Sequence, residues 1–300
     1  MITAIRGSMK QQNAYKLLAA FMILIMIIVP IAYMVTSRSD QTPQTPVPPP
    51  QEKYNPEYWV VNQPFYSISD ALNMTPYGVV TADYVDLESM TPQMAQWSRQ
   101  NFPVISEADS IYNSSSTKVY YSNLQSGKNN SFLLLSTMSP EKNDFEYIML
   151  PNTDLPILIR QEQQLSGLYN IMGNPVILAP PQTAIDVLNI IYSQNKTTTA
   201  YDRYEGLLGK VEPAQFQIVN SNVSFANQFY MGIGTSINGT YERTTAYLNI
   251  SPNNFTRLNR LRINSTQRGF EQYNITRSGN YTFIKITSPD LFNVLNEETS

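Results

Sequence analysis

The sequence predicts an α+β protein, in which an N-terminal transmembrane helix precedes an ectodomain of antiparallel sheets with helices on one face. Three observations support this class. Residues Leu17–Val35 are apolar and uncharged, β-rich runs separated by turn residues recur from Gly78 onward, and several strands lead directly into a Ser/Thr-Pro helix start. The mixture of hairpins and strand–helix units favours two ferredoxin-like halves that divide near residues 166–200.

These observations divide the chain into five parts. We expect a cytoplasmic N-terminus, a transmembrane helix, a proline-rich linker and two α+β halves, with the boundaries 1–16, 17–35, 36–57, 58–180 and 181–300.

The apolar segment Leu17–Val35 contains 19 residues without a charge. As a helix rising ~1.5 Å per residue it spans roughly 28 Å, close to the ~30 Å hydrocarbon core of a bilayer. Tyr15 and Tyr33 lie near its two ends, where aromatic rings prefer the headgroup level. The lipid bilayer is therefore the first expected partner.

The flanking charges predict the orientation of this anchor. Arg6, Lys10 and Lys16 precede it without an acidic residue, so the positive-inside rule places the N-terminus in the cytoplasm and the C-terminal domain outside the cell membrane. Two alternatives are a cleaved signal peptide and prepilin-type processing at Arg6-Gly7. A signal peptide normally has a shorter apolar core and a small-x-small exit, and a prepilin would continue without Lys10 and Lys16. The mass of the mature chain distinguishes the three.

The linker and the folded elements follow in order. Residues 42–56 contain six prolines in fifteen residues, which favours an extended polyproline II stalk. The predicted strands are Gly78–Leu87, Lys118–Leu124, Ser131–Met138, Tyr169–Met172, Val176–Ala179, Gln215–Asn220, Phe225–Gly234, Arg243–Ile250 and residues 281–287, and Glu146–Ile159 is ambiguous. The predicted helices are residues 92–102, Pro181–Gln194, Tyr201–Lys210 and those that begin at Pro252 and Pro289.

The predicted helix starts share one sequence pattern. Thr91-Pro92, Ser251-Pro252 and Ser288-Pro289 each place a capping hydroxyl before a proline, and Pro180-Pro181 follows a strand in the same way. A Ser or Thr side chain can accept a hydrogen bond from a free amide of the first turn, and proline is tolerated at the first helical position.

Glycosylation triplets of the form Asn-x-Ser/Thr occur eleven times, more often than the Ser and Thr content predicts by chance. The acceptors are Asn73, Asn113, Asn129, Asn195, Asn222, Asn238, Asn249, Asn254, Asn264, Asn274 and Asn280. An Asn/Ser/Thr-rich surface with incidental matches is the alternative. An acceptor that carries a glycan must face solvent, so Asn249 and Asn280, which the prediction places inside strands, must lie on a solvent face or stay unmodified.

The single anchor, the dense acceptors and the Tyr/Asn/Thr-rich exterior without cysteine resemble archaeal single-pass cell-envelope glycoproteins. The resemblance is one of general style and implies a surface location. It identifies no catalytic or binding residue.

Composition excludes several chemistries. The chain has no Cys and no His, so disulfides, Ser-His-Asp and Cys-His catalysis and His-ligated metals are absent. Net charge is only −3 and 14% of the residues are charged, which gives no reason to expect a nucleic-acid partner. No phosphate loop or calcium-loop spacing occurs. We therefore expect no cofactor, no metal and no catalytic residue set.

Two clusters of charge are candidate sites. Asp83, Asp86 and Glu88 crowd one strand and its exit, where alternation puts Asp86 and Glu88 on one face and Asp83 on the other. They could serve glycoside hydrolysis or a hard cation, or they could simply end the strand. The basic cluster is Arg257, Arg260, Arg262 and Arg268, which reads either as an anion or partner surface or as a solvated helix face.

Aromatic side chains are a third candidate. Trp59, Trp97 and the 20 tyrosines could line a sugar- or peptide-binding groove, or they could build the core. The sequence therefore favours a non-enzymatic surface, assembly or binding domain with an envelope protein as a further partner. The alternatives are a membrane-tethered, carboxylate-dependent glycan hydrolase and an accessory subunit of a larger membrane complex. The oligomeric state is open.

Overall fold

The computed structural model describes residues 61–126, 129–141, 147–149, 158–160, 165, 167–193, 197–236 and 238–297. The chain divides into a unit of residues 1–48 and a unit of residues 49–300, and all described residues belong to the second. The predicted anchor Leu17–Val35, the cytoplasmic segment and the linker lie outside the described residues. None of the helices in the described ranges combines the length and apolarity needed to span a bilayer.

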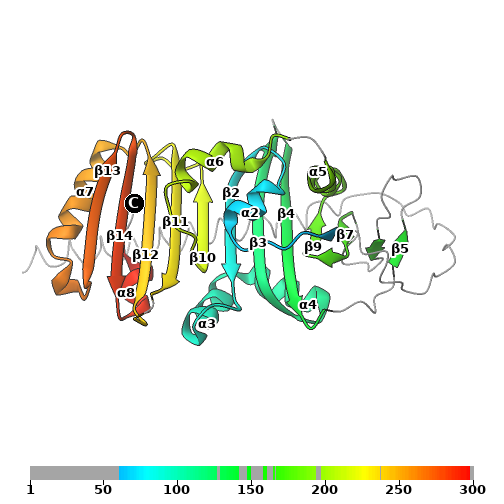
Figure 1. Ribbon diagram of the computed structural model, residues 1–300, viewed down its shortest axis with the longest axis horizontal. Helices are drawn as coiled ribbons and strands as arrows, with labels where there is room; N and C mark the ends of the chain where they lie inside the picture. The colour runs from blue at the N-terminus through cyan, green and yellow to red at the C-terminus, as the bar shows by residue number, and fades with distance from the viewer. Residues whose placement is uncertain are drawn as a thin grey trace, which may run out of the picture. The chain divides into compact units, whose positions relative to one another are not determined.

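The described residues form a mixed α+β structure built on one large antiparallel sheet (Figure 1). The strands are β1 (Val61–Asn62), β2 (Val79–Asp86), β3 (Ser115–Ser126), β4 (Asn129–Ser139), β5 (Tyr147–Met149), β6 (Leu158–Arg160), β7 (Tyr169–Ile171), β8 (Gly173–Asn174), β9 (Val176–Ala179), β10 (Phe216–Asn220), β11 (Gln228–Thr235), β12 (Tyr241–Leu248), β13 (Gln272–Ser278) and β14 (Tyr281–Ser288). The helices are α2 (Ile68–Asn73), α3 (Pro92–Asn101), α4 (Pro103–Tyr112), α5 (Pro181–Tyr192), α6 (Ala200–Leu208), α7 (Pro252–Ile263) and α8 (Leu291–Asn296).

The sheet has 12 strands in the order β13-β14-β12-β11-β10-β2-β3-β4-β9-β7-β6-β5, and β1 pairs separately with β8. The two predicted halves share this sheet, because β10 pairs with β2 in the register Phe216↔Val85 and Ile218↔Asp83. Around α7 the order is that of a split β-α-β unit, since β14 lies between β12 and β13. The first half differs, because β2 and β3, joined through α3 and α4, are direct neighbours.

Helices cover both faces of the sheet. One face, called the α6 face below, carries Tyr84 and Tyr230 into a core with Tyr204 of α6, and α2 and α5 contribute to the same core. On the opposite face, Trp97 of α3 packs against Phe216 with ring centroids 5.4 Å apart. The prediction of helices on one face is therefore wrong. All five residues of β10 are buried, and a strand whose alternate side chains are all buried must be packed against other elements on both faces of the sheet.

The helix starts follow the predicted chemistry in two of the four junctions. Thr91 accepts a hydrogen bond from the amide of Met94, and Ser251 accepts one from Asn254. Pro180 precedes α5 without a side-chain cap. The last helix begins later than predicted, because Asp290 is its cap and Ser288 instead donates to the carbonyl of Gly269.

Two helices, α2 and α4, were not predicted. α4 begins directly after α3, with Phe102 as the shared boundary residue and Pro103 at the first helical position. Proline lacks an amide hydrogen and restricts the residue before it, so it ends α3 and starts a second helix in a new direction. The sequence reading had assigned the segment after Phe102 to no element.

A buried arginine ties α8 to the sheet. Arg243 of β12 is 2% exposed, and its guanidinium donates to the carbonyls of Val294, at 2.7 Å, and Glu297, at 3.1 Å. These carbonyls belong to the last turn of α8 and the residue after it, where intrahelical donors are missing. The guanidinium therefore satisfies the C-terminal end of this helix.

We expect Arg243→Met to lower the free energy of unfolding by about 1–3 kcal/mol, because the substitution keeps much of the volume but leaves two buried carbonyls without donors. Urea denaturation of the full-length chain in detergent, followed by near-UV circular dichroism, measures the change. Arg277→Met, at an exposed position of β13, is the matched control. Equal stability of the two variants would contradict this role of Arg243.

Candidate functional site

A pocket of ≈ 670 Å³ lies on the α6 face, over the ends of β10, β11 and β12. Its lining comes from the segment before α2, the end of β2, the α6–β10 connection and the strands β11 and β12. The lining residues are Tyr66, Asp86, Glu212, Pro213, Ala214, Gln215, Gly232, Gly234, Thr235, Ser236, Glu242 and Thr244. Its volume is in the range of ordinary ligand sites, ~300–1,000 Å³.

Two glycines of β11 form the floor of this pocket. Alternation puts Tyr230, Gly232 and Gly234 on the same face, so the strand presents one ring and then bare backbone. A Cβ on Gly232 would lie 2.3 Å from the hydroxyl of Tyr230, which itself donates to the carbonyl of Glu212. Gly232 is therefore needed for the packing of Tyr230. A Cβ on Gly234 would meet nothing closer than 3.5 Å, so the space above it is open.

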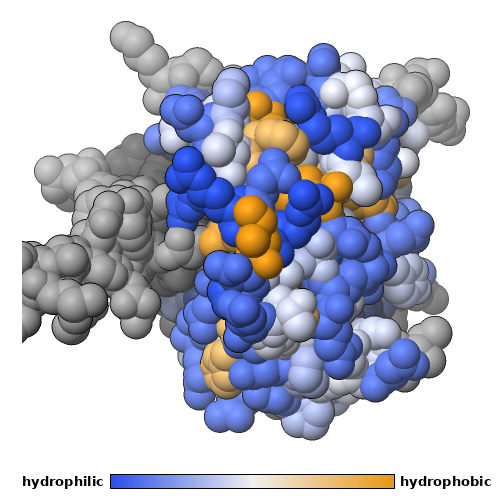
Figure 2. Space-filling model, turned by 90° about the vertical axis from the view of Figure 1, so that its left-hand side faces the viewer, coloured by the Kyte–Doolittle hydropathy of each residue, from blue (hydrophilic) through white to orange (hydrophobic). Residues whose placement is uncertain are grey.

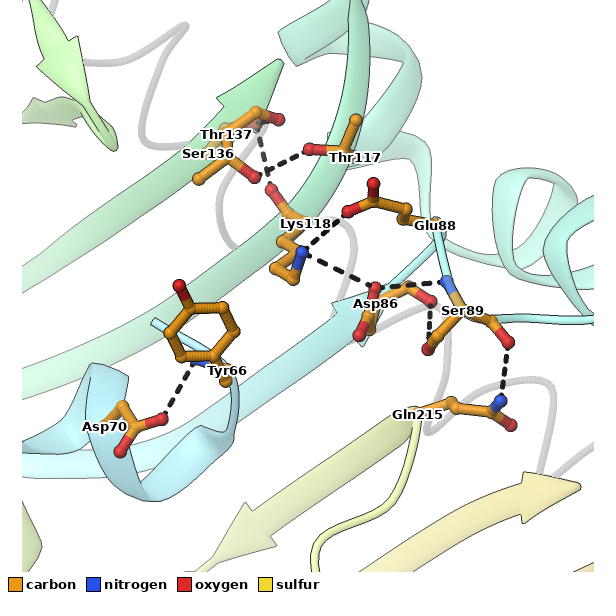
Figure 3. Close-up of polar contacts among 10 residues, drawn as sticks. All are labelled: Tyr66, Asp70, Asp86, Glu88, Ser89, Thr117, Lys118, Ser136, Thr137 and Gln215. Atoms are coloured by element: carbon orange, nitrogen blue, oxygen red, sulfur yellow. Dashed lines mark hydrogen bonds and ion pairs between the residues drawn. The ribbon is translucent and has the colours of Figure 1, made fainter. Parts of the chain in front are cut away.

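One wall of the pocket is an ion-paired cluster (Figure 3). Lys118 of β3 lies 2.8 Å from Glu88 and 4.0 Å from Asp86, and its ammonium lies 5.7 Å from the ring centroid of Tyr66. The hydrogen bond from Lys118, with its positive charge, lowers the pKa of Glu88. Asp86 and Glu88 both contact Lys118, but β2 ends at Asp86 and Glu88 lies in the turn after it, so the alternation predicted for this pair does not extend to Glu88.

Gln215 fixes the middle of the pocket. Its Nε2 donates to the carbonyl of Ser89 at 2.6 Å, and its Oε1 accepts from the amide of Thr235 at 2.9 Å. The amide of Ser89 in turn donates to Asp86 at 3.3 Å. The side chain is thus held from two sides, and the wall is organised without a ligand.

The far wall is formed by β12. Glu242 is opposite Gly234 in the sheet register and pairs with Lys285 of β14 at 2.7 Å. Because β10 and β11 lie between β2 and β12, the backbones of Asp86 and Glu242 are about 14 Å apart at the usual strand spacing. The pocket therefore has a lysine-paired carboxylate on each side.

Asp83 does not belong to this pocket. It lies on the opposite face of β2, as alternation predicted, in register with Tyr121 and Ile218. Asp83 is half-buried, and its Oδ1 is enclosed and accepts no hydrogen bond from the part of the chain that the structure describes. Burial raises the pKa of Asp83 from 3.8 to about 7.

This shift predicts a pH-dependent stability. A carboxyl group with a folded-state pKa above its unfolded value does not affect the fold at low pH and destabilises it as the pH rises toward 7. A tenfold change in the acid dissociation constant of the carboxyl group corresponds to ~1.4 kcal/mol, so the free energy of unfolding falls by at most ~4 kcal/mol above pH 7. Asp83→Asn should remove this loss, so that the variant equals the parent at pH 4 and exceeds it in stability at pH 8.

Urea denaturation of the full-length chain at both pH values tests this expectation. Glu205→Gln, at an exposed position of α6, is the charge-matched control and should leave the difference between pH 4 and pH 8 unchanged. If Asp83→Asn also leaves that difference unchanged, Asp83 ionises freely in the fold.

The basic cluster is split by the structure. Arg257, Arg260 and Arg262 lie on α7, whereas Arg268 follows in a separate 3₁₀ turn. Arg268 pairs with Glu297 and donates to the carbonyl of Leu261, so it has a local structural role. Figure 2, which faces the α7 end of the sheet, shows a mainly hydrophilic surface with small hydrophobic islands. Arg260 and Arg262 are exposed and Arg257 is half-buried, which favours a largely solvated helix face for them.

The described glycosylation acceptors are mostly at the surface. Eight have exposed side chains, namely Asn73, Asn113, Asn222, Asn238, Asn249, Asn264, Asn274 and Asn280. Asn249 and Asn280 lie just outside β12 and β14, joined by a hydrogen bond from the amide of Asn249 to the carbonyl of Asn280. Asn254 is half-buried and donates its amide nitrogen to Ser251.

Asn195 lies outside the described residues, and only the backbone of Asn129, at the start of β4, is described. Trp59 also lies outside the described residues. Trp97 is half-buried and packs edge-on against Phe102 and Phe216, which favours a packing role over a groove. Among the described residues, no group of three or more acidic side chains is arranged to hold a metal ion.

Sequence reasoning missed most of the pocket. Tyr66, Lys118, Gln215 and Glu242 are separated along the chain and share no motif. The one available signal was the spacing of Gly232 and Gly234 within a β-rich run, because glycine in a strand interior marks a close approach or an open site. That spacing was included in the predicted strand Phe225–Gly234 but given no functional weight.

No family model matches the chain, and no curated protein matches it either. Among solved structures it is similar to crystal form III of TP0453, with a TM-score of 0.44 and 11% identity over 74% of this chain and 96% of that one. Crystal form I of TP0453 gives a TM-score of 0.42 and 11% identity over 75% and 95%. These values are too low to carry a function over to this chain.

Proposed function

We propose that the protein is a single-pass membrane-anchored binding domain of the cell envelope, with its ectodomain outside and its ligand site in the glycine-floored pocket. The single observation that carries the binding role is the pocket itself, whose walls are organised by Lys118, Gln215 and Lys285 while the space over Gly234 stays open. A site that is organised before its ligand arrives loses less free energy in ordering side chains on binding.

The charges in the pocket support binding over glycan hydrolysis. A hydrolase of the common type needs one carboxyl group that keeps its proton and a second within ~5–10 Å. Asp86 and Glu88 share Lys118, and the lowered pKa of Glu88 favours its ionised form. Glu242, on the far wall, pairs with a lysine of its own.

The exposed acceptors support the outside location. The eight exposed asparagines satisfy the geometric condition for glycosylation, and the anchor Leu17–Val35 predicts the same side of the membrane from independent residues. A partner in the envelope, with the chain as an assembly protein or an accessory subunit, is compatible with this role.

Protease treatment of intact cells tests the orientation. We expect the ectodomain to be digested while a tag at the N-terminus stays protected, because the positive flank keeps residues 1–16 inside. Glycan release should lower the mass of peptides that contain Asn274 and Asn280. Protection of the C-terminal half, or a mature chain that begins after Val35, would contradict the proposal.

Gly234→Leu tests the site. The side chain should fill the open pocket without a clash, because the nearest neighbour of the new Cβ is Oε1 of Gln215 at 3.5 Å. In a thermal-shift screen of the full-length chain against oligosaccharides and peptides, we expect ligands that stabilise the parent to lose their effect on this variant. Ser278→Leu, at an exposed position of the edge strand β13, should behave like the parent.

Two results would contradict the proposal. Equal stabilisation of parent and Gly234→Leu would place the site elsewhere. Bond cleavage in the same panel that disappears in Asp86→Asn or Glu88→Gln would make the protein a hydrolase.

A further inference from the structure

We infer that the pocket recognises an ammonium group, so that its ligand is an amine-bearing molecule such as an amino sugar or a lysine side chain. This inference rests on the proposed binding function and specifies its ligand class. It follows from the charge of the pocket, from its hydrogen-bond inventory and from the aromatic ring at its rim.

The lining is acidic. Asp86, Glu212 and Glu242 line the pocket, and none of the described lining residues is Lys or Arg. Two lysines at the margins, Lys118 and Lys285, are already ion-paired with carboxylates. Glu212 is exposed and has no ion pair with another described residue. The pocket therefore repels anions and attracts a cation.

The hydrogen-bond inventory points to a ligand that donates. The amide nitrogen of Gln215 is used by Ser89, and the ammonium groups of Lys118 and Lys285 are used by carboxylates. What remains among the described charged and amide groups of the wall is acceptors, namely the free lone pairs of the carboxylates of Asp86, Glu212 and Glu242. An ammonium group has three donors and no acceptor, so it complements this wall.

The rim adds an aromatic surface. Tyr66 is 67% exposed, and its ring already lies near the ammonium of Lys118. The face of an aromatic ring attracts cations within ~6 Å of its centroid. The bare backbone at Gly234 leaves room for the body of the ligand behind its charged group.

Other ligand classes fit less well. A divalent cation needs a compact set of oxygen ligands, and the described residues contain no such group. A neutral sugar would displace water from the carboxylates without replacing it by a charge, which is unfavourable. An amine-bearing ligand matches both the negative charge of the pocket and its unused hydrogen-bond acceptors.

A pair of matched probes tests the inference. Glucosamine tetramers carry a free amine on each ring, and the N-acetylated tetramer has the same rings without the charge. Isothermal titration of the full-length chain in detergent should show binding of the amine form, weakened by salt, and at least tenfold weaker binding of the N-acetylated form. The glycans are removed enzymatically before the titration, so that a glycan on Asn238, in the β11–β12 turn, cannot interfere with binding.

Variants then locate the binding. Glu212→Gln should weaken the amine form several-fold, and the double variant with Glu242→Gln at least tenfold, because each removes a negative charge from the lining. Glu205→Gln removes the same charge from an exposed position of α6 and should leave affinity unchanged. Gly234→Leu should block the amine form.

Each outcome decides something different. Equal binding of the two tetramers would show that the ring is recognised and would overturn the ammonium inference while the binding function stands. Amine binding that survives Gly234→Leu and both Glu substitutions would be surface adsorption and would overturn the inference. If neither tetramer and no free lysine peptide binds, the ammonium inference is overturned as well. The binding function itself fails only if every ligand in the thermal-shift panel affects the parent and Gly234→Leu equally.

Discussion

The pairing of β2 with β10 is the interaction on which the rest of the structure depends. It joins the strands of the two sequence halves into one sheet and sets the register that brings Asp86 beside Gln215. Because side chains alternate strictly along a strand, that register also decides that Asp86 and Gly234 share one face while Asp83 faces the other way. A slip of one residue would move each set of side chains to the opposite face of the sheet.

The pocket exists because one face of the sheet changes from packed to bare within a single strand. Tyr230 is fully buried beneath α6, and its hydroxyl reaches over Gly232 to the α6–β10 connection. Beyond that point α6 has ended and β11 offers only glycine backbone. The same tyrosine therefore closes the core on one side and forms the border of the pocket on the other.

Charge is distributed around this pocket in a consistent way. Lysines form ion pairs with the carboxylates at its two margins, while the carboxylate of Glu212 at the connection has no ion pair with another described residue. Asp83, by contrast, is an acid held against its preference for water, and it affects the fold more than the pocket. Two acids three residues apart on β2 thus have unrelated roles, because burial differs on the two faces of the sheet.

The sequence alone determined the α+β class, most strand positions, the helix caps at Thr91 and Ser251, and the opposite faces of Asp83 and Asp86, since these depend on local propensity and on the period of two residues. Only the tertiary structure decided that β2 adjoins β10, that helices cover both faces, that α4 follows α3, and that Ser288 binds Gly269 instead of capping α8. It alone assembled the pocket from Tyr66, Lys118, Gln215 and Glu242. Contacts between residues so distant in the chain depend on strand pairing, and strand pairing has no signature in any one segment.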